Sequence, residues 1–326
     1  MPILGALRRK LLAGLIWLRS GAGVMGNTKA ALGAGMNIQN RWRDPPSVEQ
    51  IMRNCGYNGY MPTVVVEGIT TFYEQSGVGP DLVLIHGLTY DHTCWSSQSA
   101  ALSRLCRVTA YDLPGHGQSS APTNPFTFDF YIQHLSSLMS ALGIQNPFLA
   151  GHSMGGAVVL QYAGTFTSAV KGFVVVDSEL PDPSEGIAAR ALEVGIKQVG
   201  WAGTAPWFQN LFYSLNYQAQ NPEAVAAWRT QFLTNDPASI VAALQAWVQR
   251  KDPGKSLSSV KCPSLVVVGT EDVFAGIAKA ELVQQAIPGA QLLAIGNSGH
   301  LTLQEQAPSV TLALTQIIQL GNYSAR

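Results

Sequence analysis

The amino-acid sequence predicts an α/β fold in which helices cover both faces of a mostly parallel central sheet. Two observations carry this prediction. From about residue 61 onward, short runs dense in Val, Ile and Leu alternate with helical patterns, and continuous apolar runs of this kind are typical of strands buried on both faces. A gap of about ninety residues separates the sixth such run from the seventh, which is far longer than an ordinary crossover connection and indicates an inserted segment.

Length and composition agree with one large globular unit. The chain has 326 residues, of which 47% are hydrophobic and 12% charged, so disorder and collagen-like repeats are excluded. Its net charge of zero provides no overall attraction to nucleic acid, and we predict no nucleic-acid partner. The six histidines and four cysteines show no metal-ligand spacing, and a chain of this length needs no disulfides to fold, so we predict neither a metal site nor disulfides.

Residues 1–60 form a basic leader that differs from the rest of the chain. They hold eight Lys/Arg and two acids, and leucines recur at helical spacing from Leu4 to Leu18. This segment is either flexible or an amphipathic helix. Its pattern is compatible with a membrane-surface helix, an organelle presequence, a signal peptide, or a dispensable segment or upstream mis-start. We predict a cytoplasmic protein. The alternative is an organellar or membrane-associated one, with weak membrane-surface contact through residues 1–60.

The strands follow in order. Val64–Val66 and Thr71–Tyr73 are expected to form an opening hairpin. The later predicted strands are Leu82–Ile85, Val108–Tyr111, Phe148–Ala150, Gly172–Val176, Ser264–Val268 and Gln291–Ile295. The core is therefore predicted in two parts, residues 61–179 and 259–326.

Residues 180–258, between these two parts, are predicted to be a helical cap, or lid. The segment reads as short helices broken by Gly and Pro, and it is rich in Trp, Phe and Tyr. Most of these aromatic side chains are expected to pack the cap onto the core, and the remainder to line an apolar pocket. We name Trp201, Trp207, Phe208 and Phe212 as the pocket candidates.

A nucleophile motif directly follows the strand Phe148–Ala150. The sequence GHSMGG at residues 151–156 has the G-x-S-x-G pattern, and a helical pattern comes after it. A serine on a tight turn between strand and helix needs small neighbours two residues away, and Gly151 and Gly155 meet that need. Ser153 would then lie at a helix N-terminus, where the helix dipole favours developing negative charge.

A serine nucleophile needs a base, and the base needs an orienting acid, with the acid and then the base expected after the serine in the chain. Asp272 follows the seventh strand and His300 the eighth, so they are the predicted acid and base. Asp272 is preferred over its neighbour Glu271 because the loop would turn the Asp272 side chain back toward the sheet edge. Asp177, at the end of the sixth strand, is the alternative acid.

The oxyanion formed by attack on an ester carbonyl needs two preorganised donors. The backbone N–H of Met154, directly after the nucleophile, is the first candidate. The second is the backbone N–H of Leu88 in the loop after the third strand, where Gly87 permits close approach of the backbone.

The motifs HGL, DLPGHGQS, GHSMGG, GTED and SGH occur in this order between residues 86 and 300. Together they make the chain resemble the α/β-hydrolase fold family, in particular its capped serine esterase and lactonase-like members. The resemblance implies Ser153 as nucleophile, Asp272 as acid and His300 as base, and it implies no organic cofactor or metal. Family relatives that open epoxides or remove halides carry Asp at the nucleophile position, and Ser153 argues against both activities.

The sequence thus favours a carboxylic ester hydrolase acting on small to medium hydrophobic esters or lactones through an acyl-enzyme on Ser153. Its partner would be the small-molecule substrate. Two alternatives stay open at this point: a carbon–carbon bond hydrolase or thioesterase with the same triad, and a ligand receptor on the same fold that does not turn over its ligand.

Overall fold

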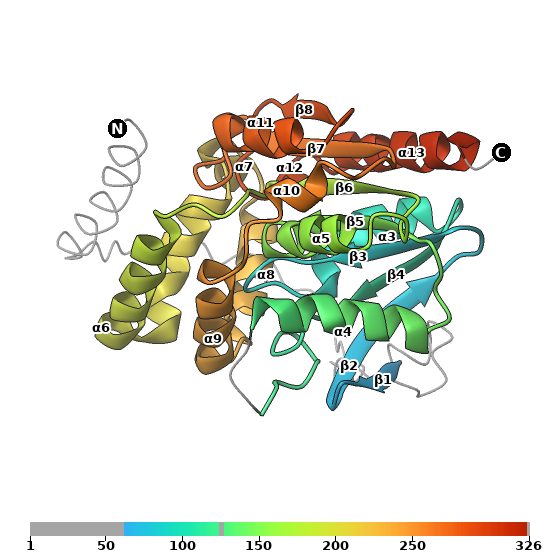
Figure 1. Cartoon of the computed structure of the whole chain (residues 1–326). Coiled ribbons are helices and arrows are strands. Elements are labelled where there is room, and N and C mark those ends of the chain that lie inside the picture. Colours follow the sequence, from blue (N-terminus) through green and yellow to red (C-terminus); the bar gives the residue numbers. More distant parts are fainter. Residues whose placement is uncertain (1–61, 124–126, 325–326) are drawn as a thin grey trace, which may run out of the picture.

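The computed structural model describes residues 62–123 and 127–324 (Figure 1). The predicted leader, residues 1–60, lies outside these ranges, as does Cys55 within it. Cys94, Cys106 and Cys262 are free thiols, in agreement with the prediction for these three residues.

One eight-stranded sheet forms the centre of the molecule. Its spatial order is β1-β2-β4-β3-β5-β6-β7-β8. The β1–β2 and β2–β4 pairs are antiparallel, and all pairs from β4–β3 to β7–β8 are parallel. The strands are β1 Thr63–Val66, β2 Ile69–Ser76, β3 Asp81–Ile85, β4 Arg107–Tyr111, β5 Phe148–His152, β6 Gly172–Val176, β7 Ser264–Gly269 and β8 Gln291–Ile295. The predicted α/β fold with a mostly parallel sheet is confirmed.

Helices cover both faces of this sheet. Because successive side chains of a strand point to opposite faces, Leu149 of β5 packs in the apolar core under α4 and α5, while Phe148 and Ala150 pack in the core under α3 and α13. The helices of the core are η1 His92–Trp95, α3 Ser96–Leu102, α4 Phe128–Ala141, α5 Met154–Thr165, α11 Ile277–Ala286, α12 Thr302–Glu305 and α13 Ala307–Ser324. Both faces of the central strands are thus buried, which explains why their sequences are apolar throughout.

The segment between β6 and β7 is helical, as predicted. It contains α6 Glu185–Phe212, α7 Leu215–Gln220, α8 Pro222–Leu233, α9 Pro237–Val248 and α10 Gly254–Leu257. The longest of them, α6, is kinked where Gly200 takes a positive φ of 71°. Figure 1 shows α6, α8 and α9 standing together at one side of the sheet. Over the described ranges, no helix has the length and apolar character needed to cross a membrane.

The first turn of α5 lies very close to the end of β3. A Cβ atom built on Gly155 would come within 2.3 Å of the Ile85 carbonyl oxygen and within 2.4 Å of the His86 carbonyl oxygen. Both neighbours are backbone atoms of a buried region, so they cannot move aside as a flexible side chain could. Gly155 therefore permits the contact that places the start of α5 against the sheet.

We expect Gly155→Ala to lower the free energy of unfolding by about 1–3 kcal/mol, although Ala is the better helix former, because the added methyl group overpacks a closed site. Urea denaturation measures this change. Gly296→Ala is the matched control, since a Cβ there meets no heavy atom within 4 Å. Equal stability of the two variants would contradict the close packing of α5 on β3.

Candidate active site

Three side chains predicted to act together come from the carboxyl ends of three strands. Ser153 directly follows β5, Asp272 lies three residues after β7, and His300 lies in the loop after β8. In a parallel sheet these ends lie at one edge, so residues more than a hundred positions apart in the chain come together.

The backbone holds Ser153 in an uncommon conformation between β5 and α5. Its φ of 51° and ψ of −117° lie where non-glycine residues are rare. The Ser153 N–H donates to the Val176 carbonyl at 2.9 Å, and the Ser178 hydroxyl donates to the Ser153 carbonyl at 2.9 Å. Residues at the end of β6 and directly after it thereby hold the turn at Ser153 by hydrogen bonds.

The loop after β3 packs against the same turn. A Cβ on Gly87 would lie 2.8 Å from His152 Nδ1 and 3.0 Å from Ser153 Cβ, so only glycine lets this loop come so near. The next residue, Leu88, lines the same cavity as Ser153.

A continuous chain of hydrogen bonds joins the three side chains. His300 Nδ1 lies 2.9 Å from Asp272 Oδ2, and His300 Nε2 lies 2.9 Å from Ser153 Oγ. An ionised carboxylate only accepts, so Nδ1 carries the proton in this arrangement and Nε2 is free to accept the Ser153 hydroxyl. The geometry therefore allows His300 to take a proton from Ser153.

Asp272 is held in place by backbone groups of its own loop. Asp272 Oδ1 accepts the backbone N–H groups of Phe274 at 2.7 Å and of Ala275 at 3.2 Å, which leaves Oδ2 for the imidazole. The neighbouring Glu271 is exposed.

Asp177, the alternative acid from the sequence, has different partners. Its carboxylate accepts the Gly269 N–H at 2.9 Å, the Thr302 N–H at 3.0 Å and the Thr302 hydroxyl at 3.0 Å. Burial, and next the nearby Asp272 carboxylate, raise its pKa well above the usual value. Asp177 thus joins the end of β7 to the residues that follow His300.

His152, directly before Ser153, contacts the backbone of His300. Its Nε2 lies 2.7 Å from the His300 carbonyl oxygen, which can only accept, so Nε2 carries the proton. Burial, together with a smaller contribution from the neighbouring His300 ring, lowers the pKa of His152 to about 3. A neutral His152 therefore donates one hydrogen bond across the site.

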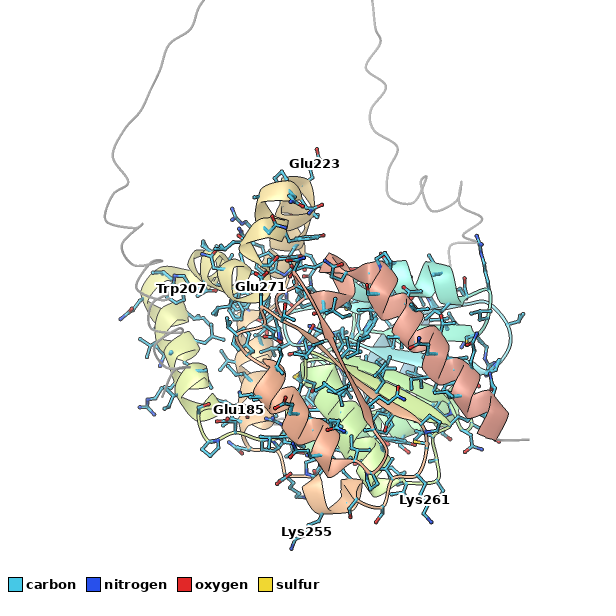
Figure 2. The ribbon with its side chains drawn as sticks, turned by 90° about the horizontal axis from the view of Figure 1, so that it is seen from above. Glu185, Trp207, Glu223, Lys255, Lys261 and Glu271 are labelled. Atoms are coloured by element: carbon cyan, nitrogen blue, oxygen red, sulfur yellow. The ribbon has the colours of Figure 1, made fainter. Side chains whose placement is uncertain are left out.

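A mostly apolar cavity of about 200 Å³ opens onto Ser153 and His300. Leu88 and Met154 line it beside the serine, and Met154 is the first residue of α5, where helix N–H groups lack partners within the helix. The wall formed by the helices after β6 includes Leu192, Trp207, Phe208, Leu211, Phe212, Leu244 and Trp247. In Figure 2, Glu185 and Trp207 lie toward opposite ends of α6.

The structure corrects the prediction for Trp201, which does not line this cavity. Its ring stacks on Phe232 with centroids 4.2 Å apart and planes 10° apart, and its indole N–H donates to the Phe232 carbonyl at 3.1 Å. Trp201 lies just after the kink at Gly200 and turns toward α8. Its function is to pack α6 on α8, while Trp207, Phe208 and Phe212 do line the cavity.

Two carboxylates that sequence reasoning missed lie in the cavity wall. Glu179 forms an ion pair with Lys279, and burial raises its pKa to about 8 although Lys279 opposes this rise. Glu185 accepts both terminal nitrogens of Arg250, one of them at 2.7 Å. Each partner lies far away in the chain, so no local motif signals these pairs.

The chain is similar to known proteins in both sequence and structure. Residues 80–307 match the family described as the α/β hydrolase fold. The 3-oxoadipate enol-lactonase 1 of Acinetobacter baylyi is 29% identical over 232 residues, which cover 70% of this chain and 84% of that protein. The solved enol-lactonase of Burkholderia xenovorans superposes with a TM-score of 0.74 at 26% identity, covering 79% of this chain and 100% of that one. A thermophilic esterase from Thermogutta terrifontis gives a TM-score of 0.74 at 26% identity, covering 80% and 98%.

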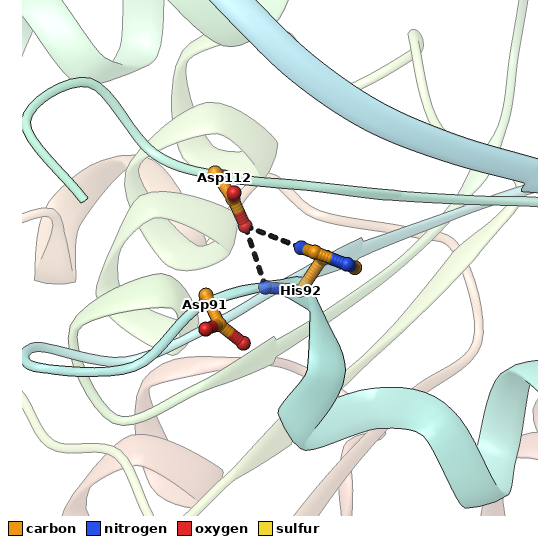
Figure 3. Close-up of side chains that lie close together, drawn as sticks. All are labelled: Asp91, His92 and Asp112. Carbon is orange, nitrogen blue, oxygen red and sulfur yellow. Dashed lines mark hydrogen bonds and ion pairs between the residues drawn. The ribbon is translucent and has the colours of Figure 1, made fainter. Parts of the chain in front are cut away.

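A second polar cluster consists of Asp91, His92 and Asp112, which do not line the cavity (Figure 3). Their ligand atoms lie within 4.8 Å of one another, a spacing that would suit a metal ion. Asp112 Oδ1, however, accepts both the backbone N–H and Nδ1 of His92 at 2.7 Å, and Asp91 accepts the Thr93 N–H at 2.9 Å. Because hydrogen bonds already occupy these atoms, we assign the cluster a structural role.

His92 is held as a cation in this cluster. Burial lowers its pKa, but hydrogen bonds to Asp112 and Glu74 raise it more, to about 10. Since the unfolded pKa is about 6.5, the charged His92 stabilises the fold fully below that pH, and the contribution declines as pH rises toward 10.

We therefore expect the difference in unfolding free energy between wild type and His92→Gln to be largest near pH 6 and to shrink toward pH 10. Urea denaturation of both proteins across this range measures it. A gap that widens with rising pH would show that His92 is neutral in the folded protein.

Proposed function

Because the chain belongs to the α/β hydrolase family, we propose that it is a serine hydrolase that cleaves carboxylic esters or lactones of small to medium hydrophobic substrates. The observation that carries this proposal is the unbroken hydrogen-bond chain from Asp272 through His300 to Ser153, which ends in an apolar cavity. The similarity to an enol-lactonase and to an esterase supports the choice of substrate class.

In the proposed reaction, His300 Nε2 takes the Ser153 proton as the oxygen attacks the carbonyl carbon. The resulting imidazolium is stabilised by Asp272 and returns the proton to the leaving alkoxide. Water then attacks the acyl-enzyme with His300 again acting as base, and Ser153 is released. The backbone N–H groups of Leu88 and Met154 are the proposed donors to the oxyanion.

The helices of residues 180–258 form the proposed cap. Trp207, Phe208 and Phe212 would contact the apolar part of the substrate, because their side chains line the wall of the cavity opposite the strand ends. We further propose a cytoplasmic location with a small-molecule substrate as the partner. Weak membrane contact through residues 1–60 stays the alternative to be tested.

The full-length chain should hydrolyse p-nitrophenyl esters, and Ser153→Ala should reduce kcat by at least about 10³-fold because the nucleophile is lost. A series from acetate to palmitate, followed by release of p-nitrophenolate, measures both the activity and the acyl length that the cavity accepts. A folded wild-type protein without any turnover would instead favour carbon–carbon bond hydrolysis or a receptor role.

Matched isosteric variants distinguish the roles of the Asp272 and Asp177 carboxylates. Asp272→Asn should lower kcat by about 10⁴-fold, since the imidazole loses its orienting acceptor. Asp177→Asn should lower kcat by no more than about tenfold, because Asp177 contacts backbone and hydroxyl donors and not the imidazole. Steady-state kinetics with one ester measures kcat for both variants. A larger loss of kcat in Asp177→Asn than in Asp272→Asn would make Asp177 the acid.

A further inference from the structure

The loop that carries His300 is attached to the end of α6 by its own backbone. The His300 N–H donates to the Phe212 carbonyl at 2.7 Å. The ring of Phe212 lines the cavity, and its centroid lies 5.5 Å from that of the His300 ring. Phe212 therefore lines the cavity with its side chain and binds the His300 backbone with its own carbonyl group.

Glu305, the last residue of α12, also connects the His300 loop to the α6–α7 joint, the two residues Tyr213 and Ser214 between these helices. Its Oε1 accepts the Gly299 N–H at 3.1 Å, and its Oε2 accepts the Ser214 hydroxyl at 2.5 Å. The Ser214 N–H also points at this carboxylate, 3.2 Å from Oε1. Glu305 thus joins Gly299, the residue before His300, to Ser214, the N-cap residue of α7.

Ser214 occupies a defined place in this network. Its oxygen accepts the Tyr217 N–H at 3.1 Å as the N-cap of α7, while its proton goes to Glu305. A second bond, from the Tyr213 hydroxyl to Gln304 Oε1 at 2.7 Å, runs parallel to it. In Figure 1, α7 and α12 accordingly lie next to each other.

A half-buried carboxylate at this point has a cost, because burial disfavours its charged form and raises its pKa. Donors from Ser214, 91 residues away in the chain, and from nearby Gly299 offset that cost. The Gly299 position is also closed, since a Cβ there would lie 2.7 Å from the Phe212 carbonyl oxygen and 2.8 Å from the Ser214 nitrogen. The His300 loop therefore has little freedom to move independently of the α6–α7 joint.

We propose that Glu305 is a positioning residue that connects the His300 loop to the α6–α7 joint by hydrogen bonds. The position of the His300 imidazole then depends on how the substrate packs against Phe212. This inference rests on the proposed function. Glu305 itself touches neither Ser153 nor the imidazole in the contacts of the described residues, and it acts through the Gly299 and Ser214 backbone.

The test compares Glu305→Gln, Ser214→Ala and the double variant with wild type, all as the full-length chain. Gln keeps the shape of Glu but presents an NH₂ group to donors. Glu281→Gln is the matched control, since Glu281 is exposed on α11. We measure kcat and KM for the best p-nitrophenyl ester, the rate constant for inactivation of Ser153 by a fluorophosphonate, and the melting temperature.

We expect Glu305→Gln to lower kcat and the fluorophosphonate rate constant by about tenfold, with KM changed by less than about twofold, because a displaced base slows proton transfer from Ser153. Ser214→Ala should act in the same direction, and the double variant should lose no more than Glu305→Gln alone. Glu281→Gln should match wild type. If Glu305→Gln does not fold, the same split between kcat and KM in Ser214→Ala decides the question.

A lower melting temperature with unchanged kcat and fluorophosphonate rate would overturn the inference, and so would a change in KM alone. The proposed function fails separately. A wild-type chain that reacts with the fluorophosphonate but hydrolyses no ester would refute the esterase proposal, while the inactivation rates of the variants would still judge Glu305. No reaction of wild type with either reagent would overturn both.

Discussion

The parallel pairing of β5, β6, β7 and β8 is the constraint on which the rest of the structure depends. Parallel strands end at the same edge, so the chain returns to one small region each time it leaves the sheet. Ser153, Asp272 and His300 each stand just beyond such an end. A hydrogen-bond ladder between backbones thereby brings together side chains that have no proximity in the sequence.

Buried and half-buried polar side chains position the loops at this edge. Asp177 connects the end of β7 with Thr302, His152 holds the His300 carbonyl, and Glu305 joins the His300 loop to α7. Each of these groups would cost free energy if it were buried without partners, so each favours the one arrangement that supplies them. The loops of the candidate site are consequently specified by long-range hydrogen bonds, whereas apolar packing specifies the sheet.

Aromatic residues in the helices after β6 have two functions: they pack the helices together, and some of them line the cavity. Trp201, Phe208 and Phe232 belong to one aromatic cluster, yet Phe208 also faces the cavity and Trp201 does not. The kink at Gly200 turns Trp201 toward α8, and composition alone carries no trace of that turn. This is why the sequence identified an aromatic segment over the site but misassigned one of its pocket residues.

By itself, the sequence determined where the strands lie along the chain, the mostly parallel sheet, the helical insertion and the glycine-flanked turn at Ser153. These features depend on hydrophobic periodicity and on steric needs within a few residues. It also named the three side chains that the structure joins by hydrogen bonds, although their catalytic roles stay a prediction. Only the tertiary structure decided which aromatic rings face the cavity and which partners Asp177, Glu179 and Glu305 have. Apart from the bond between Gly299 and Glu305, those polar contacts join segments tens of residues apart. Their geometry follows from the packing of whole helices against the sheet, which no local pattern encodes.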